Sequence, residues 1–147
     1  MVRRYLTVIT IVLFSFGTAF TQESELSLFN STGKATAYID FADERTIYLW
    51  SGDPVAYLER DSQGGYHVYG FNGEHLGWFV GGILRDHDGK AACATKDAMS
   101  RTDFEPFKSF KKFKPFRSFQ EFAPFRPFFS DGWSELSCQY HLSQGKN

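Results

Sequence analysis

Residues 46–58, TIYLWSGDPVAYL, and residues 67–79, HVYGFNGEHLGWF, follow one pattern and decide the fold. In both, an aliphatic residue stands five positions before a turn glycine, and a small residue and then an aromatic one follow it by four and five positions. Weaker copies lie at residues 27–39 and 83–95. A small polar residue precedes each glycine, and such pairs favour a hairpin with a two-residue type I′ turn. The pattern predicts four hairpins that turn at Gly33, Gly52, Gly73 and Gly89.

The four hairpins are expected to pack against one another, because a single two-stranded hairpin is only marginally stable in water. Their turn glycines recur at intervals of 19, 21 and 16 residues, which suits one hairpin per repeat. Such units can stack into a linear solenoid or close into a ring around a pseudo-fourfold axis. Since closure protects the strand edges, we predict an all-β ring over residues 26–101.

Several segments resemble a family of small bacterial domains, the four-fold β-flower. They are residues 48–52 (YLWSG) with 54–58 (PVAYL), residues 69–73 (YGFNG) with 75–79 (HLGWF), and residues 86–89 (DHDG). The resemblance covers residues 28–98, about half the chain, and implies four hairpins arranged like petals. It implies no catalytic residue and no cofactor.

Residues 102–129 follow a different rule, because every third residue from 104 to 128 is phenylalanine. Polyproline II has three residues per turn and would place all nine on one ridge, whereas an α-helix or a strand would scatter them. Proline stands directly before phenylalanine four times, and the segment also repeats every nine residues. We predict a polyproline-II-like tail whose candidate interaction ridge is Phe104, Phe107, Phe110, Phe113, Phe116, Phe119, Phe122, Phe125 and Phe128.

Charge is divided between the two regions. Residues 20–103 contain seven Lys or Arg against thirteen Asp or Glu, whereas residues 104–129 contain six against two. An acidic body attracts a basic tail, and burial of nine phenylalanines contributes on the order of 10–25 kcal/mol before ordering costs. We therefore expect the tail to bury its phenylalanines against its own body or a second copy of the chain. An anionic membrane surface and a disordered low-complexity tract are the alternatives.

Residues 1–22 have the features of a signal peptide. Arg3 and Arg4 precede an apolar run over residues 5–16, and small residues follow at 17–19. The run is too short to favour a membrane span, although an uncleaved anchor is an alternative. We predict a secreted or periplasmic protein. At the other end, residues 130–147 form a C-terminal segment with a short helix expected around residues 134–140, and residues 96–101 are expected to close the array with a helical turn or a loop.

The chain has two cysteines, Cys93 and Cys138. Export would permit a disulfide between them. Cys93 also stands four positions after Gly89, in the repeat's column of small residues, which is expected to face inward. There a free thiol packs as a small hydrophobic group. The column favours an unpaired Cys93, and two cysteines alone do not decide the question.

His87, between Asp86 and Asp88, is a candidate for a metal site or a general base, with His67 and His75 nearby in sequence. No metal-binding helix motif, paired-cysteine motif, phosphate-binding glycine loop or nucleophile elbow accompanies it. We predict no catalytic residue, no metal site and no cofactor. A small metal-dependent hydrolase centred on His87 is the alternative.

The aromatic residues near the turns are a second candidate site. Trp50, Phe71 and Trp78 could form an aromatic surface that stacks on sugar rings, although such sets more often pack between strands. Export and the acidic body weigh against nucleic acid as a partner. We expect a non-enzymatic interaction or structural module whose partner is protein, and a glycan-binding module is the alternative.

Overall fold

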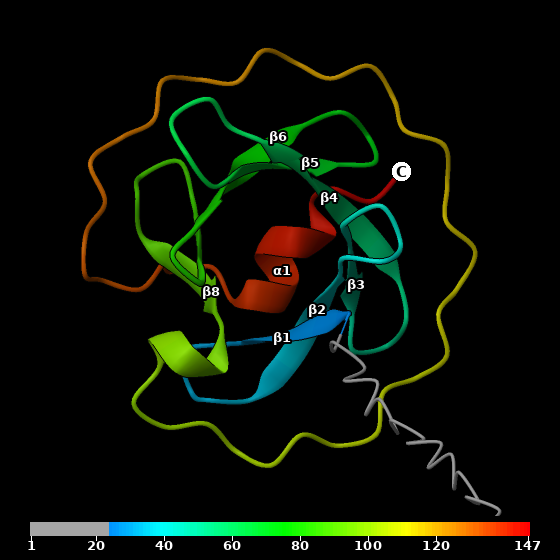
Figure 1. Cartoon of the computed structure of the whole chain (residues 1–147), viewed down its shortest axis with the longest axis vertical. Coiled ribbons are helices and arrows are strands. Elements are labelled where there is room, and N and C mark those ends of the chain that lie inside the picture. Colours follow the sequence, from blue (N-terminus) through cyan, green and yellow to red (C-terminus); the bar gives the residue numbers. More distant parts are fainter. Residues whose placement is uncertain (1–23) are drawn as a thin grey trace, which may run out of the picture.

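The computed structural model describes residues 24–147 as a closed antiparallel barrel of eight strands, in which neighbours in the chain are neighbours in the barrel (Figure 1). Each hairpin pairs two consecutive strands across a turn glycine, so the predicted ring of four tandem hairpins is confirmed. The predicted signal peptide, residues 1–22, lies outside the described residues. The strands are β1 (Glu25–Phe29), β2 (Ala35–Asp40), β3 (Thr46–Leu49), β4 (Pro54–Arg60), β5 (Tyr66–Gly70), β6 (His75–Val80), β7 (Ile83–Arg85) and β8 (Ala91–Ala94).

The hairpin turns are one residue longer than predicted. In the first, the Gly33 N–H donates to the Asn30 carbonyl at 3.0 Å, and the Asn30 N–H donates to the Lys34 carbonyl at 2.9 Å. The same two bonds recur at the other three turns. Each is a three-residue loop in which a type I turn is followed by a left-handed residue. The type I′ prediction was wrong because the glycine alone takes positive φ, from 79° to 89°, while the residue before it does not.

The inward face of the barrel forms the core together with a short C-terminal helix. Leu28, Ile39 and Ile47 from the strands are fully buried there. Helix α1 (Cys138–Ser143) lies at the centre of the ring (Figure 1), and its Leu142 joins this core. The helix begins later than predicted because Ser137 caps it, accepting the Tyr140 N–H on its side-chain oxygen at 3.2 Å.

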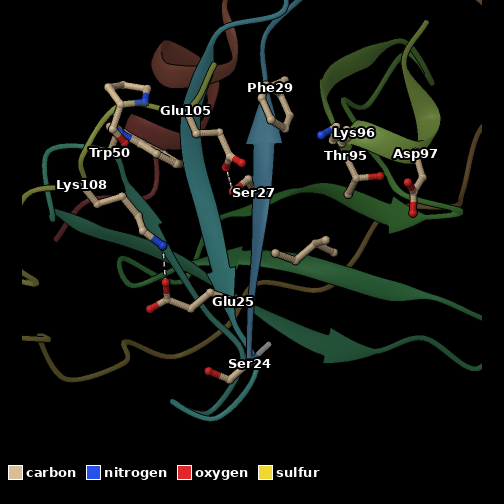
Figure 2. A pocket seen from close by; sticks show the side chains of 12 residues that line it. Ser24, Glu25, Ser27, Phe29, Trp50, Thr95, Lys96, Asp97, Glu105 and Lys108 are labelled. Carbon is tan, nitrogen blue, oxygen red and sulfur yellow. Dashed lines mark hydrogen bonds and ion pairs between the residues drawn. The ribbon is translucent and has the colours of Figure 1, made fainter. Parts of the chain in front are cut away.

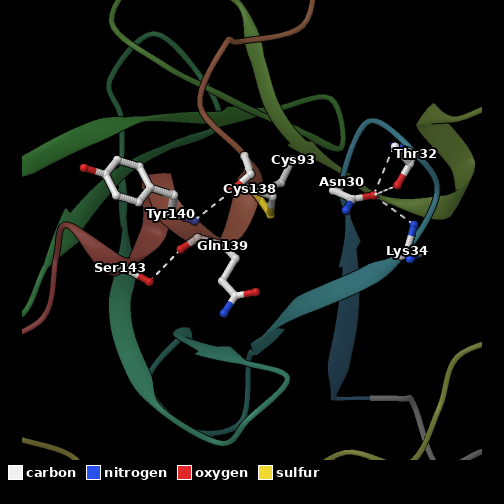
Figure 3. The surroundings of a disulfide bond; sticks show 9 residues. Asn30, Thr32, Lys34, Cys93, Cys138, Gln139, Tyr140 and Ser143 are labelled. Carbon is white, nitrogen blue, oxygen red and sulfur yellow. Dashed lines mark hydrogen bonds between the residues drawn. A yellow bond between two sulfur atoms is a disulfide. The ribbon is translucent and has the colours of Figure 1, made fainter.

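Cys93 and Cys138 form a disulfide, which corrects the preference for an unpaired Cys93 (Figure 3). Cys93 is fully buried in the small column of the repeat, as predicted. The pairing follows from the position of α1, which brings Cys138 into the barrel interior against β8. The 45 residues that separate the two cysteines hide this contact from the sequence.

After β8 the chain forms a short 3-10 helix, η1 (Lys96–Ala98), at the place where a helical turn was one of the two predicted outcomes. Residues 101–130, here called the belt, then run around the outside of the barrel without helix or strand (Figure 1). The chain returns to the barrel at Trp133, which bridges to Ala91. Within residues 24–147 no helix has the length and apolar character needed to cross a membrane.

Candidate interaction surface

At each hairpin turn, a backbone N–H of the belt donates a hydrogen bond to the carbonyl of the turn glycine. The bonds measure 2.8 to 3.1 Å. Their donors are the N–H groups of Asp103, Lys112, Glu121 and Ser130, and their acceptors are the carbonyls of Gly33, Gly52, Gly73 and Gly89 in that order. Successive donors are nine residues apart, so each nine-residue repeat of the tail spans the distance from one hairpin turn to the next. The hairpin repeat of the barrel and the nine-residue repeat of the belt are therefore in register.

A second set of backbone bonds follows the same register. The N–H groups of Ser109 and Ser118 donate to the carbonyls of Trp50 and Phe71, at 3.1 and 2.9 Å. Both acceptors stand two residues before a turn glycine. The next position of the nine-residue repeat is Pro127, which has no N–H to donate. The belt is therefore held by two bonds at each of the two middle hairpins.

The turn glycines are required by contact as well as by conformation. A Cβ atom on Gly52 would overlap the carbonyl oxygen of Phe110, and a Cβ atom on Gly73 would overlap that of Phe119. Gly89 has the same relation to Phe128. Only glycine lets the belt backbone come this close to the turn.

Cationic side chains of the belt cover the aromatic outer face of the barrel. The Lys108 ammonium lies 4.4 Å from the ring centre of Tyr38, and nine residues later the Arg117 guanidinium lies 3.8 Å from that of Tyr57. Both tyrosines are almost fully buried. Such stacking of a cation on a ring is more favourable where the pair is shielded from water.

Acidic residues of the barrel also pair with the belt cations. Lys111 bridges Glu25 and Asp40, and although burial opposes the shift, these carboxylates raise the pKa of Lys111. The hydrogen bond from Lys114 is the main reason that the pKa of Asp43 is lowered. These contacts account for the division of charge seen in the sequence. The remaining pairs join Lys108 to Glu25, Lys112 to Asp53, Lys114 and Arg117 to Glu44, and Arg126 to Asp61.

The nine phenylalanines of the candidate ridge point into solvent, so the expected burial of this ridge against the barrel was wrong. Their side chains are 92 to 104% exposed, from Phe104 to Phe128. The physical reason is that the outer face of the barrel offers carboxylates and ring faces, which match Lys and Arg better than phenylalanine. Exposure of every third residue is what three residues per turn would produce, and the polyproline II conformation itself stays a prediction.

The candidate aromatic surface is not exposed, which agrees with the more frequent arrangement in which such residues pack between strands. Phe71 and Trp78 are almost fully buried, at 0 and 1% exposure, so neither can stack on a sugar. Trp50 is partly buried, and its indole N–H donates to the Pro106 carbonyl in the belt at 3.2 Å. Phe71 packs with Tyr57, and Trp78 packs against His75 and His87.

The three histidines noted in the sequence form a hydrogen-bonded row. One ring nitrogen of His75 lies 3.0 Å from His67, and the other lies 2.9 Å from His87. Burial, followed by the charges of His87 and His67, lowers the pKa of His75 to about 4. Both His75 nitrogens are thus engaged by other histidines. Within residues 24–147 no group of three or more His, Cys, Asp or Glu is placed to hold a metal ion.

The register between belt and hairpins was not predicted, although the sequence contains a signal for it. Four turn glycines leave three intervals, and the phenylalanine-rich segment contains three units that begin with Pro-Phe nine residues apart, at residues 106, 115 and 124. Only the structure shows that each unit covers one interval.

A family model described as "4-fold beta flower protein" matches residues 26–142. The match includes the belt and most of α1 as well as the barrel. No curated protein and no solved structure is significantly similar to the chain.

Proposed function

Because the chain belongs to the 4-fold beta flower family, whose description names a fold and no activity, we propose that it is a non-enzymatic binding module that presents a ring of phenylalanines. The observation that carries the proposal is the exposure of the nine ridge phenylalanines on a belt that is hydrogen-bonded at all four turns. Monomeric proteins rarely expose this much apolar surface in one line without a partner.

A second copy of the chain is the partner that we propose. The belt cations are paired with carboxylates of their own barrel, so they are not free to attract an anionic lipid surface. At about 3.1 Å per residue, phenylalanines three apart on an extended ridge are separated by roughly 9 Å. Two such ridges offset by half that distance would place rings roughly 4.7 Å apart, within the range of favourable aromatic pairs.

The area available suits a reversible contact. A belt that circles the barrel is convex, so two copies can meet only along one arc. Three phenylalanines from each copy would bury roughly 450–750 Å² per partner, just below the roughly 800 Å² of a standard stable interface. Several arcs are equivalent through the nine-residue repeat, so each copy can contact more than one neighbour.

Sedimentation velocity over a protein concentration range of about 5 to 500 µM tests this proposal. The native chain should sediment faster as concentration rises, and the variant Phe113→Ser/Phe116→Ser/Phe119→Ser should lose much of that increase while it stays folded. The control variant Phe41→Ser/Leu136→Ser/Tyr140→Ser changes three exposed residues that are not part of the belt. A native chain that remains monomeric throughout, or a control that loses association equally, contradicts the proposal. Co-sedimentation of a monomeric chain with anionic vesicles would identify lipid as the partner instead.

We further propose that the protein acts outside the cytosol. The features of residues 1–22 and the disulfide between Cys93 and Cys138 both support an oxidising compartment. Amino-terminal sequencing of the protein recovered from the periplasm or medium tests this assignment. Recovery of the uncleaved chain with reduced cysteines from the cytosol would overturn it.

A further inference from the structure

The barrel closes with one incomplete seam, between β8 and β1. The other neighbouring strands pair through three to five residue pairs, whereas β8 and β1 share one, Phe29 with Ala94. The seam joins the last hairpin to the first, and it is the one place where the chain must leave the barrel to begin the belt (Figure 1).

The hairpin repeat shows which residue pair is absent between β8 and β1. In the three complete seams between hairpins, the residue seven positions after a turn glycine pairs with the residue six positions before the next. These pairs are Asp40 with Thr46, Glu59 with His67, and Val80 with Ile83. The equivalent pair in the fourth seam would be Lys96 with Ser27. Lys96 instead begins η1, and the Thr95 N–H donates to the Gly82 carbonyl at 2.8 Å.

The backbone of β1 therefore has an open edge. The Ser24 carbonyl accepts the Phe41 N–H at 2.8 Å. Because backbone groups alternate in direction along an antiparallel strand, Ser24, Leu26 and Leu28 direct their N–H and carbonyl groups towards β2. Glu25 and Ser27 turn their N–H and carbonyl groups to the opposite side, where Phe29 meets β8. Within residues 24–147 no backbone group is bonded to Glu25 or Ser27 on that side.

A cavity of about 620 Å³ runs along this edge. Helix η1 faces β1 across it, and Trp50 and the start of the belt border it on the far side of β1 (Figure 2). Leu26 opens into the cavity and is 36% exposed, whereas Leu28, on the same face of the strand, is fully buried. The space is thus apolar on its inner side and lined by unpaired backbone.

Charge around the cavity favours a basic occupant. Glu25 is paired with Lys108 and Lys111. Asp97 and Glu105 also border the cavity, and within residues 24–147 neither forms an ion pair. The single positive charge of Lys96 balances only one of these two negative charges.

We propose that the open edge of β1 binds an extended peptide of another protein, which adds as a ninth strand antiparallel to β1. Its backbone pairs with Glu25 and Ser27, in the place that the repeat assigns to Lys96 and its neighbours. Alternate side chains of the peptide are apolar, against Leu26, and basic, towards Asp97 and Glu105. Main-chain pairing supplies the affinity in this mode of recognition, and the alternating side chains supply the specificity.

Titration of the full chain with the end-blocked peptide Thr-Val-Lys-Val-Lys-Val-Thr, followed by NMR, tests this proposal. Saturable shifts centred on the Glu25 and Ser27 amides are expected. The same peptide with N-methyl groups on the alternate amides that face β1 keeps every side chain, and it should bind at least about tenfold more weakly because the backbone donors are lost. Equal binding of the two peptides, no binding, or shifts centred on the belt phenylalanines would each overturn the proposal.

A pair of variants tests the edge from the protein side. Ser27→Pro removes a donor that faces the cavity and no bond to β2, so the barrel should persist while peptide affinity falls about tenfold. Ser27→Ala removes the hydroxyl that donates to Glu105 and keeps the backbone donor, so it should bind like the native chain. Equal affinity of folded Ser27→Pro and Ser27→Ala contradicts the proposal. Should Ser27→Pro fail to fold, the N-methylated peptide decides the question with the native chain.

Discussion

The carbonyl oxygen of Phe110 occupies the place where a Cβ atom on Gly52 would stand. In the same contact the Lys112 N–H donates to the Gly52 carbonyl at 2.9 Å. Belt and hairpin are thus joined backbone to backbone, at a position where no side chain fits. The relation recurs at Gly73 and Gly89, so the turn glycines are the fixed points of the belt.

Gly52→Ala is expected to destabilise the protein and to release the belt locally. The left-handed φ of 87° costs any residue with a Cβ atom roughly 1–2 kcal/mol, and the overlap with Phe110 adds to that cost. Gly64→Ala is the matched control, because Gly64 has a φ of 94° but no atom within 4 Å of its Cβ position. Urea unfolding should place Gly52→Ala well below Gly64→Ala, with faster amide exchange at Lys112. Equal stabilities would mean that the belt contact contributes nothing.

Reduction of the disulfide should lower the free energy of unfolding by about 4 kcal/mol, from the chain entropy of the loop it closes. That loop spans 45 residues and contains the whole belt. Thermal unfolding of the native chain with and without reductant measures the loss. Cys93→Ala/Cys138→Ala serves as the control, since reductant should leave its midpoint unchanged. A native midpoint that does not respond to full reduction contradicts this account.

Loss of the Asp61 charge should weaken the last part of the belt. The Asp61 side chain is 6% exposed and pairs with Arg126. Removing one partner of a buried pair leaves the other uncompensated, so Asp61→Asn should cost about 2–3 kcal/mol. In Glu44→Gln, the comparison variant, an exposed carboxylate is removed, and no measurable change is expected. Urea unfolding of both variants provides the measurement, and similar stabilities would refute the role of burial.

Mild acid should destabilise the fold through His75. Its pKa is lowered to about 4 in the folded protein, from 6.5, by burial and by His87 and His67, while Asp61 opposes the shift. The unfolded chain therefore takes up the proton first, so stability is complete above about pH 6.5 and declines between about pH 6.5 and 4. The free energy of unfolding should be about 2 kcal/mol lower at about pH 5 than at pH 7.

The variant His75→Gln separates this effect from that of the barrel carboxylates that pair with the belt. Asp43, Asp53 and Glu25 have lowered pKa values, so their contribution is lost only as pH falls below their ordinary range of 3.8 to 4.5. His75→Gln should flatten the stability curve between about pH 7 and 5 and leave the loss at lower pH in place. An unchanged slope would assign the effect to another histidine, with buried His141 as the first to examine.

Much of the fold could be predicted from local pattern. The glycine of each turn and the inward column that contains Ile39 and Ile47 follow from short-range spacing, because turn conformation and strand alternation depend on neighbouring residues. Closure of the four hairpins was predicted from the need to protect strand edges. The length of the turns was not predicted, since the polar residue before each glycine suits either turn type.

The candidate site was predicted in part. The period of three placed nine phenylalanines on one ridge, and the charge division indicated that the tail meets the body. The direction of the ridge could not be predicted, because it depends on which groups the outer face of the barrel offers. Tyr57 and Asp61 are brought to that face by strand pairing and loop position, and they select Arg117 and Arg126 over the phenylalanines between them.

The sequence by itself determined two periods, one of hairpins and one of nine residues, because each is a property of residues close together in the chain. Only the tertiary structure decided that the periods coincide in space, that Cys93 meets Cys138 within the ring, and that β1 keeps an open edge beside η1. Each of these depends on where distant segments meet. That position is set by closure of the whole barrel, and short-range spacing carries no record of it.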